Sequence, residues 1–207
     1  LQHESATELL RSWIARMDDG QVPAAIQLDL QEAASKHAAL RPLIDAREQA
    51  AKKLGPLGDY QVCLEGGDAR KGRRVFHDVE AVRCTRCHTL RGNGGNAGPV
   101  LDDVGLRYTP GILLESLITP SARIAEGFTT TTLELTDSSV LSGVITKDQD
   151  GQVTIVDING KATNVPASKI RSRQADEASA MPKMGDALSK RQIRDLIVFL
   201  KHQKKES

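Results

Sequence analysis

The chain has 207 residues, of which 39% are hydrophobic and 27% are charged, an ordinary balance for a soluble globular protein. Its 28 basic and 27 acidic residues leave a formal net charge of +1, so no bulk field draws it to nucleic acid or to an anionic membrane. No stretch approaches the roughly 20 apolar residues of a membrane span. We therefore expect no nucleic-acid partner and no membrane span, and we interpret the chain, which begins without Met, as a mature form or a fragment.

Residues 1–55 are predicted to form a small helical module. Pro23 can open its second helix, and a third is expected from about Leu40 to Leu54. In the first helix Ser5 and Glu8 have the spacing of a capping box. The apolar residues that follow fall on one helical face: Leu9, Leu10, Trp13, Ile14 and Met17.

A glycine-rich linker then leads to a second helical region. Asp68 is placed to cap a helix that contains Gly72 and Phe76. The segment 91–98 has four glycines in eight residues and is predicted to be a loop. Thr109 is predicted to cap a further helix, which has Pro110 at its first position.

The pattern changes at about Phe128 to β-rich runs that turn-like segments separate. These runs cover residues 129–136, 140–146, 153–158 and 162–165, with a strand-like end at Ile170. We expect a small antiparallel β-module over residues 126–172. The helical pattern returns after it, where Ser189 and Gln192 make a capping box for a last helix.

The strongest chemical signal is Cys84-Thr85-Arg86-Cys87-His88. C-x-x-C-H is typical of c-type haem attachment, because two thiols at this spacing can each add to one vinyl group of the same porphyrin. The next residue then lies under the iron and offers an imidazole nitrogen as axial ligand. At this composition, chance gives such a motif about once in a thousand chains of this length. We therefore predict one covalent haem c, held by Cys84 and Cys87, with His88 on its iron.

Two other interpretations of these cysteines are weaker. A zinc site would recruit Cys63, Cys84 and Cys87 with either His77 or His88, but adjacent Cys87 and His88 do not easily face one tetrahedral metal. A thioredoxin-like redox pair would need a βαβ pattern around the motif, and that pattern is missing.

The sixth ligand of the iron is predicted to be a methionine. Met/His ligation raises the potential and suits electron transfer. The chain has three methionines, and two of them, Met181 and Met184, lie in the Pro-containing loop just before the last helix. We favour Met181, with Met184 as the second choice.

In chain order these features resemble a class I cytochrome c. The matching residues are Gly72-x-x-x-Phe76, Cys84–His88, Gly98-Pro99-Val100-Leu101, Arg107, Met181-Pro182 and the segment Asp195–Leu200. A longer set, with Leu64–Asp68, the loop glycines and Pro120-Ser121 before the β-module, is similar to the haem-binding domain at the C-terminus of large planctomycete and verrucomicrobial dehydrogenase-like proteins. That family usually has Pro-Asp-Leu where this chain has Pro99-Val100-Leu101.

The resemblance implies further roles for two residues. Pro99 would accept a hydrogen bond from the His88 ring through its carbonyl, and Arg107 would pair with a haem propionate. The implied fold is mainly α: a cytochrome c-like helical haem domain with the β-module inserted before its last helix. The expected divisions are 1–55, 60–125, 126–172 and 173–207.

The function that follows is one-electron transfer, without enzymatic activity of its own, in a periplasmic or otherwise extracytoplasmic bacterial protein. The partner would be a redox protein or a fused dehydrogenase domain. Two alternatives stay open. One is a haem with an open or displaceable sixth position, acting as a peroxidase or a gas or redox sensor. The other is a binding module in which haem is structural.

Overall fold

The structure, a computed structural model, describes residues 2–204, except for the side chains of residues 2–5 and 18. It corrects the expected fold class. The chain is 45% helix and 21% strand and includes a five-stranded antiparallel sheet, so it is a mixed α/β structure and the prediction of a mainly α cytochrome c-like fold is wrong. Among the described residues, no helix has the length and apolar character needed to cross a membrane.

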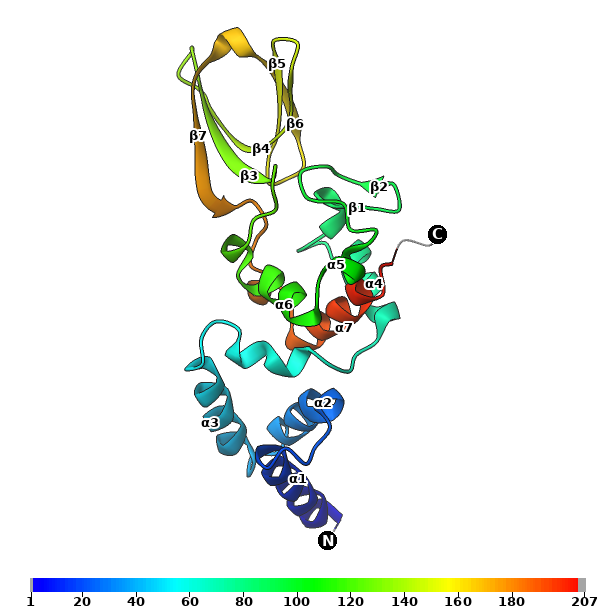
Figure 1. Ribbon diagram of the computed structural model, residues 1–207. Helices are drawn as coiled ribbons and strands as arrows, with labels where there is room; N and C mark the ends of the chain where they lie inside the picture. The colour runs from blue at the N-terminus through cyan, green and yellow to red at the C-terminus, as the bar shows by residue number, and fades with distance from the viewer. Residues whose placement is uncertain (1, 205–207) are drawn as a thin grey trace.

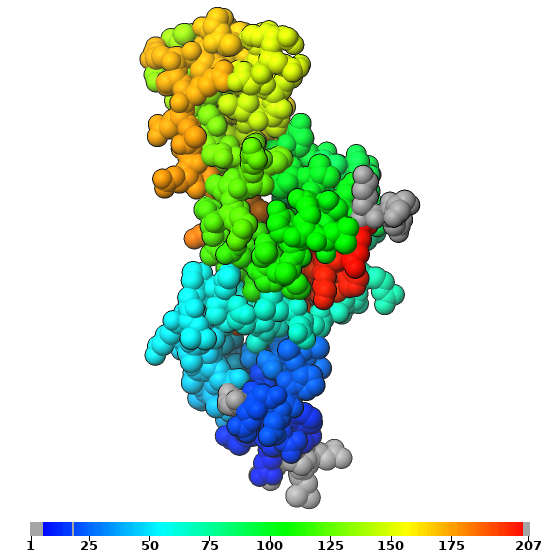
Figure 2. Space-filling view, viewed as in Figure 1, coloured from blue at the N-terminus to red at the C-terminus, as the bar shows by residue number. Residues whose placement is uncertain are grey.

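The molecule has three parts in a row (Figures 1 and 2). The N-terminal helices lie at one end, the five-stranded sheet lies at the other, and the remaining helices lie between them. The N-terminal helices are α1 (Gln2–Asp18), α2 (Ala24–Ser35) and α3 (Arg41–Lys52). All three were predicted, but α1 begins at Gln2, so Ser5 is not its N-cap.

The N-terminal helices join the central part through ion pairs. Arg194 of α7 (Lys190–Lys201) places Nη1 2.7 Å from Asp29 Oδ2, and Arg191 pairs with Glu32. The Arg194 side chain is only 5% exposed, whereas the Asp29 side chain is 43% exposed. The pKa of Asp29 is lowered, chiefly by the hydrogen bond from Arg194. The joint is therefore polar, with a buried guanidinium at its centre.

The central part surrounds the main hydrophobic core. Its helices are α4 (Ala69–Asp78), α5 (Val104–Arg107), α6 (Pro110–Ile118) and α7, with short 3-10 turns η1 (Gly58–Cys63), η2 (Cys84–Arg86), η3 (Pro120–Ala122) and η5 (Met184–Asp186). The predicted caps are present, because Asp68, Thr109 and Ser189 all accept hydrogen bonds from the first turns of α4, α6 and α7.

Helices α4 and α7 cross closely at a glycine. A methyl group at Gly72 would stand 2.0 Å from the Asp195 carbonyl oxygen and 2.7 Å from Phe199 Cβ. The rings of Phe76 and Phe199 pack beside this point, with their centroids 5.6 Å apart. Gly72 is therefore required at this crossing for steric reasons.

The β-module is one curved antiparallel sheet in the order β6-β5-β4-β3-β7 (Figure 1). Its strands are β3 (Thr129–Leu135), β4 (Val140–Gln149), β5 (Gln152–Val156), β6 (Ala162–Pro166) and β7 (Ile170–Ser179), with η4 (Ala167–Lys169) between the last two. One face carries a small core of its own around Leu133, Val153 and Ile155. The sheet ends at Ser179, seven residues beyond the predicted boundary at 172, so Met181 follows almost directly after a strand.

Candidate cofactor-attachment site

The Cys84–His88 segment turns tightly and is enclosed by the glycine-rich loop after it. Cys84–Arg86 form η2, and the His88 backbone N–H donates to the Cys84 carbonyl at 2.9 Å. The loop contains a two-residue hairpin, β1 (Thr89–Leu90) with β2 (Asn93–Gly94), which sequence analysis missed. Methyl groups at Gly94 and Gly95 would stand 2.1 Å from the His88 carbonyl oxygen and 2.0 Å from that of Arg86. These glycines therefore let the loop lie directly on the motif backbone.

His88 is oriented from two sides. Its Nδ1 lies 2.9 Å from the Pro99 carbonyl oxygen, the contact that the family resemblance implied. Its ring packs on Gly98, where a methyl group would stand 2.7 Å from Cε1. Burial lowers the pKa of His88 and so favours the neutral imidazole, and its Nδ1–H donates a hydrogen bond to the Pro99 carbonyl oxygen. Nε2 has no hydrogen-bond partner among the described residues and is not sealed from solvent, so it is free to act as a ligand.

The two cysteines of the motif are free thiols in apolar surroundings. Cys84 packs at the edge of the main helical core, whereas Cys87 packs against Ala97, Val144 and Val156. Burial raises the pKa of Cys84 to about 11 and raises that of Cys87 as well. Redox-active dithiols have a lowered thiol pKa, so this environment argues against the thioredoxin-like alternative.

The two candidate methionines have different environments. Met184 is 3% exposed and lies inside the main core. Met181 is partly exposed and packs on the edge of the same core, as Cys84 does. A thioether at the edge of the core can coordinate an iron without disrupting the packing of the core. The arrangement therefore favours Met181 over Met184.

Arg107 already has partners of its own. Its Nε donates to Asp103 Oδ1 at 2.9 Å, its Nη2 donates to the Val100 carbonyl at 2.8 Å, and the guanidinium lies over the Tyr108 ring. Pairing with a propionate would require these donors to be shared, so that role stays a prediction.

The β-module lies against the motif. Val144 and Val156 belong to the same hydrophobic cluster as Cys87. The β5–β6 turn also approaches the motif, since a methyl group at Gly160 would stand 3.2 Å from the Arg86 carbonyl oxygen. Asp157 shapes that turn by accepting from the Lys161 backbone N–H at 2.8 Å. The β-module therefore packs beside the Cys84–His88 segment.

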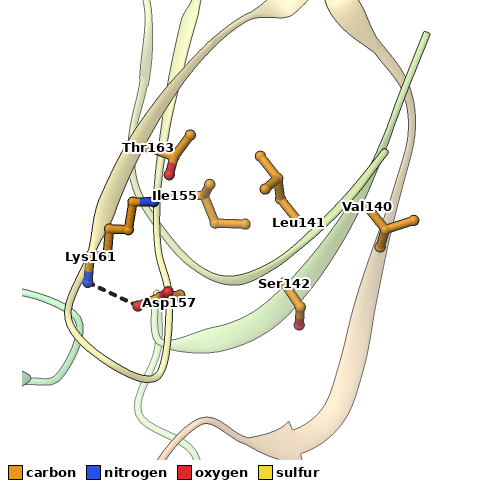
Figure 3. Close-up of a pocket in the computed structure, with 7 residues that line it drawn as sticks. All are labelled: Val140, Leu141, Ser142, Ile155, Asp157, Lys161 and Thr163. Carbon is orange, nitrogen blue, oxygen red and sulfur yellow. Dashed lines mark hydrogen bonds between the residues drawn. The ribbon is translucent and has the colours of Figure 1, made fainter. Parts of the chain in front are cut away.

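A separate hollow of about 240 Å³ lies within the β-module (Figure 3). Its lining includes Leu141, Ile155 and Thr163, with Asp157 and Lys161 at one side, and it contains no His, Cys or Met. The Asp157 carboxylate at its side accepts hydrogen bonds from the backbone N–H groups of Asn159 and Lys161, so it serves the β5–β6 turn.

The zinc alternative is not supported. In the described part of the chain, no three His, Cys, Asp or Glu side chains gather as a metal site would require. Cys63 is fully buried, its thiol donates to the Lys190 carbonyl at 3.3 Å, and burial raises its pKa to about 12. His77 packs its ring against Phe76 and Phe199 instead. Cys63 is therefore an inert core thiol.

The residues present fit a covalently bound haem. Such a group needs two free thiols in a C-x-x-C sequence, a neutral imidazole with one nitrogen available to the iron, and apolar surroundings. No protein-family model matches the chain, and no curated protein is significantly similar to it. The resemblance to class I cytochromes c therefore rests on the quoted motifs alone.

Proposed function

We propose that this chain binds one haem c through Cys84 and Cys87 and transfers single electrons. The observation that carries the proposal is the state of His88, in the same five-residue segment as two unpaired thiols: the Pro99 carbonyl engages its Nδ1, while its Nε2 has no hydrogen-bond partner among the described residues. An imidazole held in this way has a fixed orientation and tautomer, and the hydrogen bond at Nδ1 raises its basicity as a ligand.

When bound, the haem supplies reversible one-electron chemistry at iron, and the protein's own residues set how easily it occurs. His88 provides a neutral nitrogen because its burial disfavours the imidazolium. Val144 and Val156 exclude water from the Cys87 side of the site. Met181 would complete the coordination, which raises the potential.

Covalent attachment is the first test. The full chain is expressed with haem-maturation machinery and extracted with acidified organic solvent, and the mass of the polypeptide is measured. We expect a mass increased by one haem, and none in the Cys84→Ser/Cys87→Ser variant. A wild-type polypeptide with the bare chain mass contradicts the proposal.

An optical spectrum separates electron transfer from the two haem alternatives. Low-spin Met/His haem has a thioether-to-iron charge-transfer band in its oxidised form, whereas a peroxidase or gas sensor with an open position does not. We expect the band, and we expect Met181→Ala to abolish it while Met184→Ala retains it. A five-coordinate spectrum in the wild type would favour a catalytic or sensing haem.

The role of the β-module is tested by replacing residues 128–178 with a short Gly/Ser linker. Because the module covers the Cys87 side, we expect covalent attachment to persist while the potential falls, since a wetter site favours the more highly charged oxidised iron. An unchanged potential and an unchanged electron-transfer rate would identify the module as a spacer or a separate binding unit.

A further inference from the structure

The sheet face opposite the module's own core carries mostly polar side chains, and it is apolar and buried at the end that lies beside Cys87. We name this the motif face. Thr132 and Ser142 lie on it side by side, paired across β3 and β4. Closer to the attachment site it carries Val144 and Val156, which are 1% and 5% exposed and pack against Cys87.

Thr130 belongs to this buried end. It pairs with Val144 across β3 and β4, and Val144 pairs with Val156 across β4 and β5. Directly paired residues of antiparallel strands project from the same side of a sheet, so the three side chains form one row on the motif face. On the other side of β3, Thr129 pairs with Ser179, the last residue of β7 before the Met181 loop. Thr130 thus lies between the wall beside Cys87 and the segment that carries Met181.

Among the described residues of this face, Thr130 has the one buried side-chain polar atom without a partner. Its Oγ1 is buried and has no hydrogen-bond partner among residues 2–204. The hydroxyls further along the face are paired: Thr132 Oγ1 lies 3.2 Å from Asp176 Oδ2, and Thr154 Oγ1 lies 2.8 Å from Asn164 Oδ1. A buried hydroxyl without a partner destabilises a fold, so its presence here needs a reason.

We propose that Thr130 is a further cofactor-binding residue, whose hydroxyl donates a hydrogen bond to a propionate carboxylate of the haem. The inference rests on the proposed function. Apart from the iron and the ring nitrogens, the polar groups of a haem are its two propionates. A hydrogen-bond donor at the side of the macrocycle can therefore donate to a propionate oxygen. Val144 and Val156 in the same row give the apolar contact that the rest of the macrocycle needs. On this proposal the β-module is a wall of the cofactor site.

Thr130→Val tests the proposal in the haem-loaded full chain, because it removes the hydroxyl and keeps the shape. We expect a lower reduction potential, since a propionate that loses its hydrogen bond holds a less neutralised negative charge near the iron and favours the oxidised form. We also expect a lower urea midpoint of the loaded protein. In the same full chain produced without haem, the midpoint should instead stay or rise, because the unpaired hydroxyl is gone.

Two further variants make the result specific. Thr130→Ser keeps the hydroxyl and should keep the wild-type potential. Thr131→Val changes the neighbouring threonine, whose side chain projects from the opposite face, and should also leave the potential unchanged. If Thr130→Val and Thr131→Val have the same potential and the same loaded midpoint, the proposal for Thr130 is overturned. A wild-type chain that takes up no covalent haem is a different failure, that of the proposed function, and it is seen before any variant is compared.

Discussion

The packing of His88 on Gly98 gives the sharpest structural prediction. Gly98 is buried, and its backbone is not in the left-handed region, so alanine there meets only a steric obstacle. The new methyl group would stand 2.7 Å from Cε1 and 2.8 Å from Nδ1 of the imidazole. Ordinary carbon contacts begin at about 3.5 Å, so the ring must move by roughly 0.8 Å or more.

The cost of that movement has two parts. Overpacking in a close-packed region destabilises by about 1–3 kcal/mol. A displaced ring also loses its hydrogen bond to the Pro99 carbonyl, now 2.9 Å long, which contributes about 0.5–1.5 kcal/mol. We expect Gly98→Ala to lower the free energy of unfolding by about 2–4 kcal/mol. In the haem-loaded protein the potential should rise, because an imidazole without the Pro99 bond is a less basic ligand.

Urea denaturation followed by circular dichroism measures the first effect, and redox titration measures the second. Gly111→Ala is the matched control, because the nearest atom to its new methyl group is 3.9 Å away. It lies in helix α6, so alanine there should be neutral or stabilising by up to about 1 kcal/mol. Equal stability and equal potential in Gly98→Ala and wild type would refute the packing of His88 on Gly98.

Two further predictions concern the core and the joint between the helical parts. Met184→Ala should lower the free energy of unfolding by about 3 kcal/mol because the side chain is 3% exposed, whereas Met181→Ala should lower it by less than about 1.5 kcal/mol. Thermal unfolding of both variants measures the two effects, and equal losses of stability would contradict the prediction. Asp29→Asn leaves Arg194 buried without its anion and should cost about 2 kcal/mol, against under about 0.5 kcal/mol for Asp45→Asn in an exposed pair. Since the folded-state pKa of Asp29 is lowered, its contribution to the free energy of unfolding is present above the ordinary pKa of 3.8 and is lost as the pH falls below that value. The stability difference between Asp29→Asn and wild type should therefore shrink in acid. A stability difference that persists at low pH would refute this prediction.

The elements that could be predicted from the sequence are those with local causes. The caps at Asp68, Thr109 and Ser189 are short-range hydrogen bonds between residues two or three positions apart, so the residue types alone indicate them. The length of β7 could not be predicted in this way. Its sequence, IRSRQADEAS, has no alternating apolar pattern, because this edge strand is ordered by hydrogen bonds to β3 and is mostly exposed. The predicted β-module therefore ended at 172, and its strand content was underestimated.

In the candidate site too, features with local causes could be predicted from the sequence and features with tertiary causes could not. Cys84, Cys87 and His88 are adjacent in sequence, and their chemistry can be recognised from spacing. The reason for the glycines at 94, 95 and 98 is tertiary: the nearest motif atom to each of them belongs to a residue six to ten positions away along the chain but close in space. Thr130 is more distant still, and in the sequence it is one of four threonines in a strand. It is distinguished by its register with Val144 and by a buried hydroxyl that has no partner within residues 2–204.

The placement of the two thiols connects the site to the architecture as a whole. Cys84 packs on the core of the central helices, whereas Cys87 packs on the β-module, although only two residues separate them. The two parts also meet where the η3 turn contacts the end of β7 and where the β5–β6 turn approaches Arg86. A group bonded to both cysteines would therefore be held by both clusters at once. A ligand that binds only the folded arrangement stabilises that arrangement. Haem attached here would therefore fix the sheet to the helices and keep the row from Thr130 to Val156 in place along the edge of the haem.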